Sequence, residues 1–205
     1  MVFLFKVSEL LERQLIEVLQ WHVKSPETNY LETSDFPSLV SQQHSVNFEL
    51  WHQEDMARDP DAPDSKIAAV KRAIDVLNQR RNDMIEQMDQ YLLTVLQKNN
   101  IQYNSDVEMN SETPGSIIDR LSINALKIYH MDEEIKRPNV ADEHRKKCSV
   151  KLSVLNDQRN DLTKSLETLL ADLNNGKKRL KVYQQMKMYN DENLNPILYQ
   201  KEKNK

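Results

Sequence analysis

The sequence contains very little glycine. Gly115 and Gly176 are its only glycines in 205 residues. β-Hairpin turns, phosphate-binding loops and dinucleotide-binding turns all depend on glycine, because they need positive φ angles or a close approach of the backbone. The shortage of glycine therefore argues against these structures and favours a helical protein.

Cysteine and long apolar segments are scarce as well. Cys148 is the only cysteine, so one chain can form neither an internal disulfide bond nor a multi-cysteine zinc site. The opening stretch MVFLF is too short for the core of a signal peptide. No apolar run approaches the length of about 20 residues that crosses a membrane. We therefore expect no membrane insertion and a reducing, cytoplasmic location.

An excess of positive charge is also missing. The formal net charge is −4 and the isoelectric point is about 5.8, whereas nucleic-acid binding draws much of its affinity from basic side chains that neutralise phosphates. We therefore expect no nucleic-acid partner. Charged residues make up 29% of the chain and hydrophobic residues 39%, a balance typical of a soluble protein with long helices.

Prolines divide the chain into helical segments. Each of the seven prolines falls where the hydrophobic period breaks, and proline marks helix boundaries because it lacks an amide hydrogen. The sequence predicts a single all-α domain over residues 1–205, with no strand. The expected helices span about 4–24, 38–58, 64–98, 116–136 and 141–174, and a sixth spans 177–191, after an Asn-Asn-Gly helix end.

One pattern occurs twice along the chain. LNQRRND begins at Leu77 and LNDQRND begins at Leu155, 78 positions later. The same shift aligns Pro60 with Pro138 and places the Trp-His pair at 51–52 on the Tyr-His pair at 129–130. We interpret this as internal duplication of a helix hairpin, over about 38–98 and 116–176. Two such hairpins would pack about a pseudo-two-fold axis as a four-helix bundle, with extra N- and C-terminal helices on its flanks.

An arginine interrupts the apolar seam of each long helix at the equivalent position, Arg81 and Arg159. Apolar residues otherwise recur at alternating spacings of three and four along both helices, and Cys148 falls on the second seam as a packed thiol. An arginine on a seam needs a carboxylate or the edge of a helix. We expect a buried ion pair that fixes helix register, in preference to a substrate-binding arginine. The expected partners are Glu54, Asp55, Asp132 or Glu133.

A second set of residues has the spacing of metal ligands. His52 and Asp55 are separated by three residues, as are Glu86 and Asp89 on the next helix, so each pair shares a helix face. Together they could supply ligands for a divalent cation such as magnesium or manganese. The alternative is a solvated surface, because Glu86 and Asp89 fall at outer heptad positions.

The stretch TPGSIIDR at 113–120 is typical of a helix start. Ser116 and Asp119 have the spacing of a capping box, and free amides at this start together with Arg120 could also bind an anion. We favour the cap alone. Asn78 and Asn82, on the first long helix, we interpret as interhelical hydrogen-bonding groups.

Three histidines, His22, His44 and His144, show no partner in the sequence pattern. We expect them to be ordinary surface or boundary residues.

Three strings, LWHQEDMAR, IDVLNQRRNDMIEQMD and TPGSIIDRLSINALKIYHM, together resemble a bacterial family known as domain of unknown function 4254. The resemblance is clearest from about Leu50 to Met131. It implies a helical protein of about this length, with no established reaction and so no catalytic residues to transfer. The strings that carry it contain Trp51, His52, Glu54, Asp55, Asn78, Arg81, Asn82, Asp119, Arg120, Lys127 and His130.

The sequence thus predicts one polar centre and two possible uses for it. The favoured use is a binding or assembly module with a buried arginine–carboxylate centre, acting as a homodimer or with a protein partner. The alternative is a metal-dependent enzyme or ligand-binding bundle that acts on a phosphate-containing small molecule. The candidate site residues are His52, Glu54, Asp55, Asn78, Arg81, Asn82, Asp119, Arg120, His130, Asp132 and Arg159.

Overall fold

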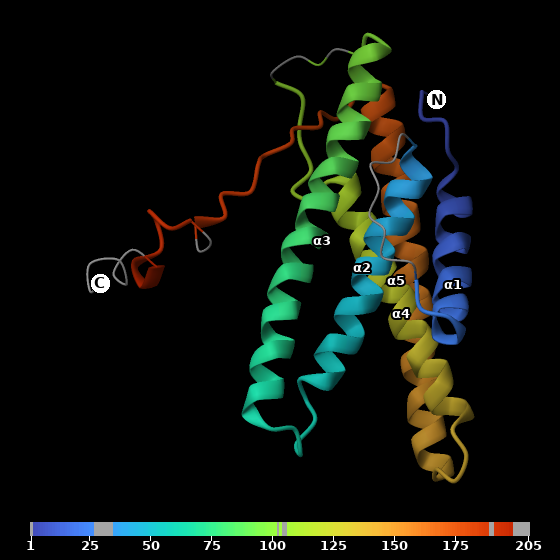
Figure 1. Ribbon diagram of the computed structural model, residues 1–205. Coiled ribbons are helices and arrows are strands. Elements are labelled where there is room, and N and C mark those ends of the chain that lie inside the picture. Colours follow the sequence, from blue (N-terminus) through green and yellow to red (C-terminus); the bar gives the residue numbers. More distant parts are fainter. Residues whose placement is uncertain (1, 27–34, 102, 104–105, 189–190, 199–205) are drawn as a thin grey trace.

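The computed structural model describes residues 2–26, 35–101, 103, 106–188 and 191–198 (Figure 1). Five long helices dominate them, and no described residue lies in a strand. The helices are α1 (Val7–Val23), α2 (Phe36–Met56), α3 (Asp64–Lys98), α4 (Pro114–Lys136) and α5 (Asp142–Asn174). The predicted all-α class is confirmed. None of the described helices is both long and apolar enough to cross a membrane.

Side-chain caps and prolines fix the starts of α2 and α4. The Asp35 carboxylate accepts a hydrogen bond from the Ser38 amide at 2.9 Å, and the Thr113 hydroxyl accepts one from the Ser116 amide at 3.2 Å. The predicted capping role of Ser116 is therefore wrong. The observed N-cap is Thr113, three residues before Ser116. Pro114 follows it in the first turn of the helix, where its missing amide hydrogen costs nothing.

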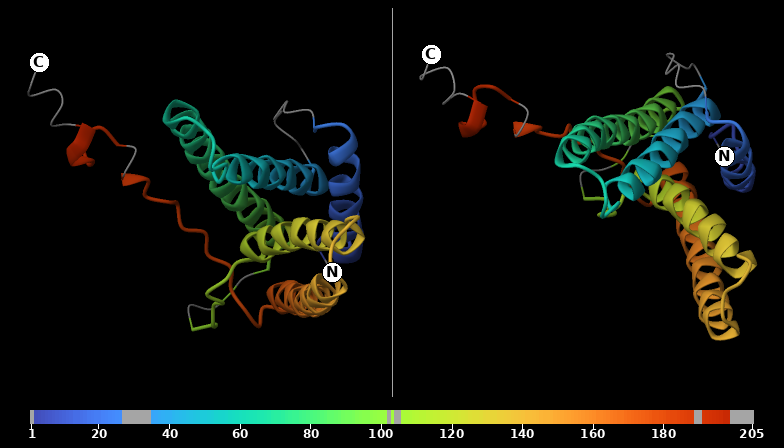
Figure 2. Two further views of the ribbon diagram at one scale, coloured as in Figure 1. Left: turned by 90° about the horizontal axis from the view of Figure 1, so that it is seen from below. Right: turned by 60° about the horizontal axis from the view of Figure 1, so that its bottom comes forward.

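The helices associate as two pairs. α2 packs chiefly against α3, and α4 packs chiefly against α5. The two pairs share a core toward one end and splay apart toward their connecting turns, as Figures 1 and 2 show. The shared core is built from aliphatic side chains of the predicted seams and their neighbours. These include Met88, Leu92, Leu96, Ile118, Leu121, Leu166, Leu170 and Leu173, each at most 2% exposed.

Helix α1 lies against α2, α4 and α5. Val7, Leu11 and Val18 of α1 are buried. The first helix was expected to begin at about residue 4, but Leu4 precedes α1 and is 99% exposed. The two longest helices have different neighbours outside their own pairs. α5 contacts α1, whereas α3 contacts α4.

The predicted sixth helix is wrong. Gly176 ends α5 with φ of 70°, and the Lys177 amide donates to the Asp172 carbonyl at 2.9 Å, which confirms the predicted helix end. The following residues up to 187 are not helical. Leu180 is buried in the core. The chain then passes α3, where Lys187 pairs with Asp83, and extends away from the five helices toward its C-terminal end (Figure 1). Residues 189 and 190 of the predicted helix lie outside the described residues.

Candidate functional site

A buried carboxylate, Asp119 on α4, joins three helices. Its side chain is 5% exposed and accepts hydrogen bonds from Arg81 of α3 through Nε and Nη2, both at 2.9 Å. It also accepts from Gln43 Nε2 at 2.6 Å and Asn47 Nδ2 at 2.9 Å, both on α2. Charge-assisted and bidentate hydrogen bonds of this kind are the strongest that side chains form. The network therefore fixes the α2–α3 pair against α4.

The ion-pair partner expected for Arg81 was wrong. Glu54 pairs with Arg58 at 2.9 Å on the same helix, and Asp132 pairs with Lys136 at 2.5 Å on the surface. Their side chains are 44% and 42% exposed, so neither acid enters the core. Asp119 is the acid that meets Arg81, because the rotation of α4 turns that residue inward.

Arg159 is buried without a carboxylate partner among the described residues. Its guanidinium donates to the Leu11 carbonyl at 2.6 Å and lies 3.5 Å from the Leu121 carbonyl. Burial lowers its pKa to about 10. The prediction that Glu54, Asp55, Asp132 or Glu133 would pair with it was wrong, because α1 covers this arginine and offers main-chain acceptors instead.

A cavity of about 330 Å³ with a mixed polar and apolar lining opens beside the network, between α2, α3 and α4. We call it the Arg81 cavity. It lies at the lower end of the volume range of small-molecule sites. It is lined by Asn47, Leu50, Trp51, Glu54, Asp55 and Arg58 of α2, Asn78 and Arg81 of α3, and Ile123 and Leu126 of α4.

Four of the predicted site residues line the Arg81 cavity, namely Glu54, Asp55, Asn78 and Arg81, and Asp119 supports it from behind. Others lie elsewhere. Arg120 forms an exposed pair with Glu112 at 2.7 Å, Arg159 faces α1, and Asp132 faces solvent. Asn82 is half-buried on α3 but is not part of the cavity wall.

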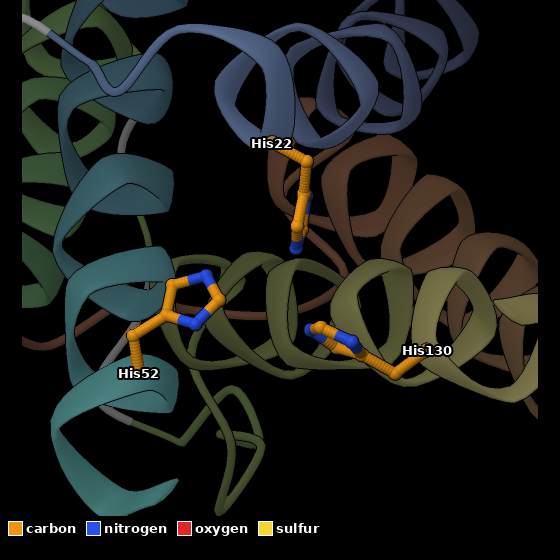
Figure 3. A group of neighbouring side chains, drawn as sticks. All are labelled: His22, His52 and His130. Atoms are coloured by element: carbon orange, nitrogen blue, oxygen red, sulfur yellow. The ribbon is translucent and has the colours of Figure 1, made fainter. Parts of the chain in front are cut away.

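Three histidines from three helices converge nearby (Figure 3). His22 lies in the last turn of α1, His52 lies near the end of α2, and His130 lies on α4. One ring nitrogen of each lies within 4.8 Å of the other two. Among the residues that the structure describes, this is the one group of three or more His, Cys, Asp or Glu side chains with the spacing of metal ligands.

Hydrogen bonds orient two of these rings. His22 Nδ1 lies 2.7 Å from the Val18 carbonyl oxygen, which can only accept, so Nδ1 carries the proton. His130 Nδ1 lies 2.8 Å from the Glu133 carboxylate. In each ring Nε2 is buried and has no hydrogen-bond partner among the described residues. An unpaired buried polar atom costs about 1–3 kcal/mol, so these two nitrogens call for an explanation.

Aromatic side chains hold the histidine rings in place. Tyr129 stacks on His22 with ring centroids 3.9 Å apart, and Trp51 stacks on His130 at 4.7 Å. Phe48 packs edge-on against His52 at 4.5 Å. Burial, followed by the neighbouring histidines, lowers the pKa of His52, which favours a neutral ring with a free lone pair.

The predicted metal ligands His52, Asp55, Glu86 and Asp89 are not brought together as one group. Asp89 accepts a hydrogen bond from the Gly115 amide at the start of α4, at 2.7 Å. Glu86 faces the C-terminal segment, where its carboxylate lies 3.5 Å from the Gln185 amide. Only His52 of the four belongs to the histidine group.

The expectation for the remaining histidines was wrong for His22 and His44. His22 joins His52 and His130, and His44 is fully buried. His144 lies 2.9 Å from Glu134 and is partly exposed, as expected of a boundary residue. The shift of 78 residues already aligned His52 with His130, but no local signal connected His22 to them.

The buried His44 makes stability sensitive to acid. Its Nε2 donates to the Gln14 carbonyl at 3.0 Å, and its Nδ1 lies 2.6 Å from the Ser122 hydroxyl. Burial lowers its pKa from 6.5 to about 3. Between these values the unfolded chain binds the proton and the folded chain does not. His44 therefore makes the free energy of unfolding decrease as pH falls from 6.5 towards 3, by up to about 1.4 kcal/mol per pH unit.

The buried Asp89 has the opposite effect. Burial raises its pKa from 3.8 to about 6, against the hydrogen bonds from Thr113 and Gly115, which lower it. Between these values the folded chain binds the proton and the unfolded chain does not. Asp89 therefore makes the free energy of unfolding increase as pH falls from 6 towards 3.8. The contributions of Asp89 and His44 oppose each other in this window.

The fold and these residues define an all-α protein with a carboxylate-centred polar network, an adjoining cavity of mixed lining and a histidine cluster. The chain belongs to the family described as "Protein of unknown function (DUF4254)", whose model matches residues 37–182. The resemblance noted in the sequence is therefore confirmed. His22 and the rest of α1 lie outside the matched segment. No curated protein and no solved structure matches the chain.

Proposed function

We propose that this protein binds a small polar molecule in the Arg81 cavity. The observation that carries the proposal is the position of Arg81, which Asp119 holds in a bidentate pair at the cavity wall. The pair uses Nε and Nη2, which leaves the N–H groups of Nη1 for another partner. A guanidinium fixed before binding loses little conformational freedom when a ligand arrives.

The charges around the cavity indicate the class of ligand. The lining holds two acids, Glu54 and Asp55, and two bases, Arg58 and Arg81. Asp119, behind the wall, pairs with Arg81, so the cavity has no excess of positive charge. Such a wall offers a polyanion no net electrostatic attraction. The wall also combines hydrogen-bond donors and acceptors with the ring of Trp51. We infer a neutral or zwitterionic ligand rich in hydroxyl, amide or amino groups, bound by the protein without covalent change.

A phosphate-containing ligand remains the alternative that the sequence raised. It would require a cation at Glu54 and Asp55 to offset their charge. Oxygen ligands of this kind suit magnesium or manganese. The two alternatives differ in their dependence on added cations, which makes them separable by experiment.

A thermal-shift screen tests the proposal. The compounds are monosaccharides, nucleosides and amino acids, together with their phosphorylated forms, each with and without magnesium. A ligand at 100 times its dissociation constant should stabilise the fold by about 2.7 kcal/mol, or roughly 5–10 °C for a chain of this length.

Asn78→Ala removes a cavity residue, and Asn156→Ala is its matched control. Asn156 occupies the equivalent place on α5, is exposed, and bonds only back to the Leu152 carbonyl of its own helix among the described residues. The proposal expects a shift that survives Asn156→Ala and is lost in Asn78→Ala. A shift that occurs only with phosphorylated compounds and magnesium would support the alternative. No shift with any compound, or equal shifts in both variants, would reject cavity binding.

A second candidate is self-association through α1, in line with the assembly role expected from the sequence. Ile16, Leu19 and Val23 form an apolar stripe on this helix and are 45%, 58% and 91% exposed. A stripe of this kind is typical of a helix that packs against another protein surface. We propose that a second copy of the chain covers it.

Sedimentation at several concentrations tests self-association. A concentration-dependent dimer is expected for the wild type, and Leu19→Asp should shift it to the monomer. Val76→Asp is the matched control, because Val76 is 61% exposed on α3 and remote in sequence from the stripe. A monomer at all concentrations, or a dimer that Leu19→Asp leaves intact, would contradict this candidate.

Internal duplication is the evolutionary origin that we propose for the two helix pairs. The recurrence at 78 residues and the α2–α3 and α4–α5 pairing support it. The copies would then have diverged, since Arg81 now meets Asp119 while Arg159 meets main-chain carbonyls. Single-domain folding of the whole chain is part of this proposal, and one cooperative urea transition is its expected signature.

A further inference from the structure

We propose that His22, His52 and His130 form a binding site for a divalent first-row transition metal, with zinc as the first ion to test. This inference goes beyond ligand binding in the Arg81 cavity and does not depend on it. It rests on the convergence of three imidazoles from α1, α2 and α4, whose ligand atoms lie within 4.8 Å of one another (Figure 3).

The spacing is close to that of a metal-bound set. Zinc–nitrogen bonds of about 2.0–2.1 Å in a tetrahedral site place ligand nitrogens about 3.4 Å apart. Side-chain adjustment of at most about 1.4 Å would therefore bring the rings to ligand distance. All three histidines are half-buried, so their side chains have room for this adjustment.

The hydrogen bonds of the cluster match those of metal-ligating histidines. Such a histidine donates its second ring N–H to a carboxylate or a backbone carbonyl, which fixes the tautomer and orients the ring. His130 meets the Glu133 carboxylate in this way, and His22 meets the Val18 carbonyl. In both rings Nε2 is left buried and unpaired among the described residues. The two nitrogens that lack a partner are the ones that a metal would bind.

The ligand type selects the class of metal. Imidazole nitrogens suit zinc, copper, nickel and iron, whereas magnesium and manganese prefer oxygen ligands. Three protein ligands leave a fourth tetrahedral position for water or another small ligand. Trp51 stacks on His130 and also lines the Arg81 cavity, so the metal would lie one side chain away from that cavity.

The alternative is that the three rings form an aromatic cluster with no ligand, since Tyr129, Trp51 and Phe48 pack around them. Cobalt(II) distinguishes the two, because its visible absorption reports coordination number and ligand type. The experiment uses the full chain without a histidine tag, stripped with a chelator and titrated with cobalt, with zinc then added as a competitor. The proposal expects four-coordinate cobalt bands that saturate at one equivalent per chain and disappear with zinc.

Variants assign the site. His22→Ala and His52→Ala should each weaken cobalt binding by at least 100-fold. Glu133→Gln keeps all three histidines and changes a half-exposed side chain, so it should fold normally and weaken binding by about 10–100-fold. His144→Ala is the matched control, because His144 lies 3.4 Å from the Cys148 sulfur and 2.9 Å from Glu134 and does not belong to the group of three histidines. This control should bind cobalt like the wild type.

Circular dichroism of each variant separates lost ligation from lost folding. Two results would overturn the proposal. One is a wild-type chain that binds no cobalt at micromolar concentration. The other is binding that folded His22→Ala and His52→Ala retain, or that His144→Ala abolishes.

Discussion

Removing Arg81 tests the network on which the cavity depends. In Arg81→Ala, the Asp119 carboxylate keeps its burial and the two amide donors, Gln43 and Asn47, but loses both hydrogen bonds from the guanidinium. The charge that remains is then paired with no cation among the described residues. The fold must either tolerate a buried anion or open to admit water at the junction of α2, α3 and α4.

The magnitude follows from the burial of the two partners. Breaking a fully buried ion pair by removing one partner costs roughly 3–5 kcal/mol. Asp119 is 5% exposed, but Arg81 is 29% exposed, so water reaches part of the pair and the lower end of the range applies. We expect a loss of about 3 kcal/mol in the free energy of unfolding, equivalent to a fall in Tm of roughly 6–12 °C for a chain of this size.

Arg120→Ala is the matched control. Arg120 follows Asp119 directly and forms an ion pair with Glu112, but both of its partners are nearly half-exposed, at 45% and 46%. Exposed pairs contribute about 0–1 kcal/mol. Urea denaturation of the two variants at pH 7 gives the comparison. Equal losses for Arg81→Ala and Arg120→Ala would refute the view that the Arg81–Asp119 pair holds the helix pairs together.

Further predictions concern buried groups. Between pH 6 and 4, the free energy of unfolding should fall more steeply with acid in Asp89→Asn than in the wild type, and less steeply in His44→Gln. The reason is that the folded chain binds a proton at Asp89 in this range but excludes one from His44. Urea titrations at several pH values measure the slopes, and equal slopes in all three proteins would contradict the pKa shifts of Asp89 and His44. Gly115→Ala should cost about 1–3 kcal/mol, since its Cβ would lie 2.7 Å from the Ile85 carbonyl, and an unchanged urea midpoint would contradict that contact. Cys148 is buried, so its thiol should react with a disulfide reagent only after denaturant is added, and rapid modification of the native chain would show that it is accessible.

The five long helices could be predicted from the sequence because their signals are local. Prolines mark their ends, and the alternating spacing of apolar residues marks their buried faces, so each predicted boundary falls within three residues of the observed one. The predicted sixth helix lacked such a stripe. Tyr183, Met186 and Met188 are all exposed, and Leu180 is instead held by the core of the five helices.

The partner of Arg81 depended on tertiary structure. The seam correctly placed Arg81 near the core, but the choice of acid depends on how α4 is rotated relative to α3. The sequence offered a local role for Asp119, as part of a capping box. That role was plausible because three residues separate it from Ser116. Thr113 took the capping role, and Asp119 became available for the network.

The sequence identified two of the three histidines of the cluster, His52 and His130, as candidate site residues. The shift of 78 residues aligned His52 with His130, yet the interpretation of both drew on neighbouring acids of the same helices. His22 comes from α1, which lies outside the two segments that the shift aligns, and its approach depends on how α1 crosses α2 and α4. A residue whose role arises from the crossing of helices distant in sequence leaves no periodic signal.

Ligand binding in the Arg81 cavity would act through a guanidinium that Asp119 holds in place. The Arg81 Nε–H resonance measures it most directly, because this group donates to a buried carboxylate at 2.9 Å and should exchange slowly with water. Addition of the compound that stabilises the chain most should shift this resonance and the resonances of the Asn78 side-chain amide. The Nε–H resonance of Arg120 should stay unchanged. A stabilising compound that shifts neither Arg81 nor Asn78 would contradict binding in the Arg81 cavity.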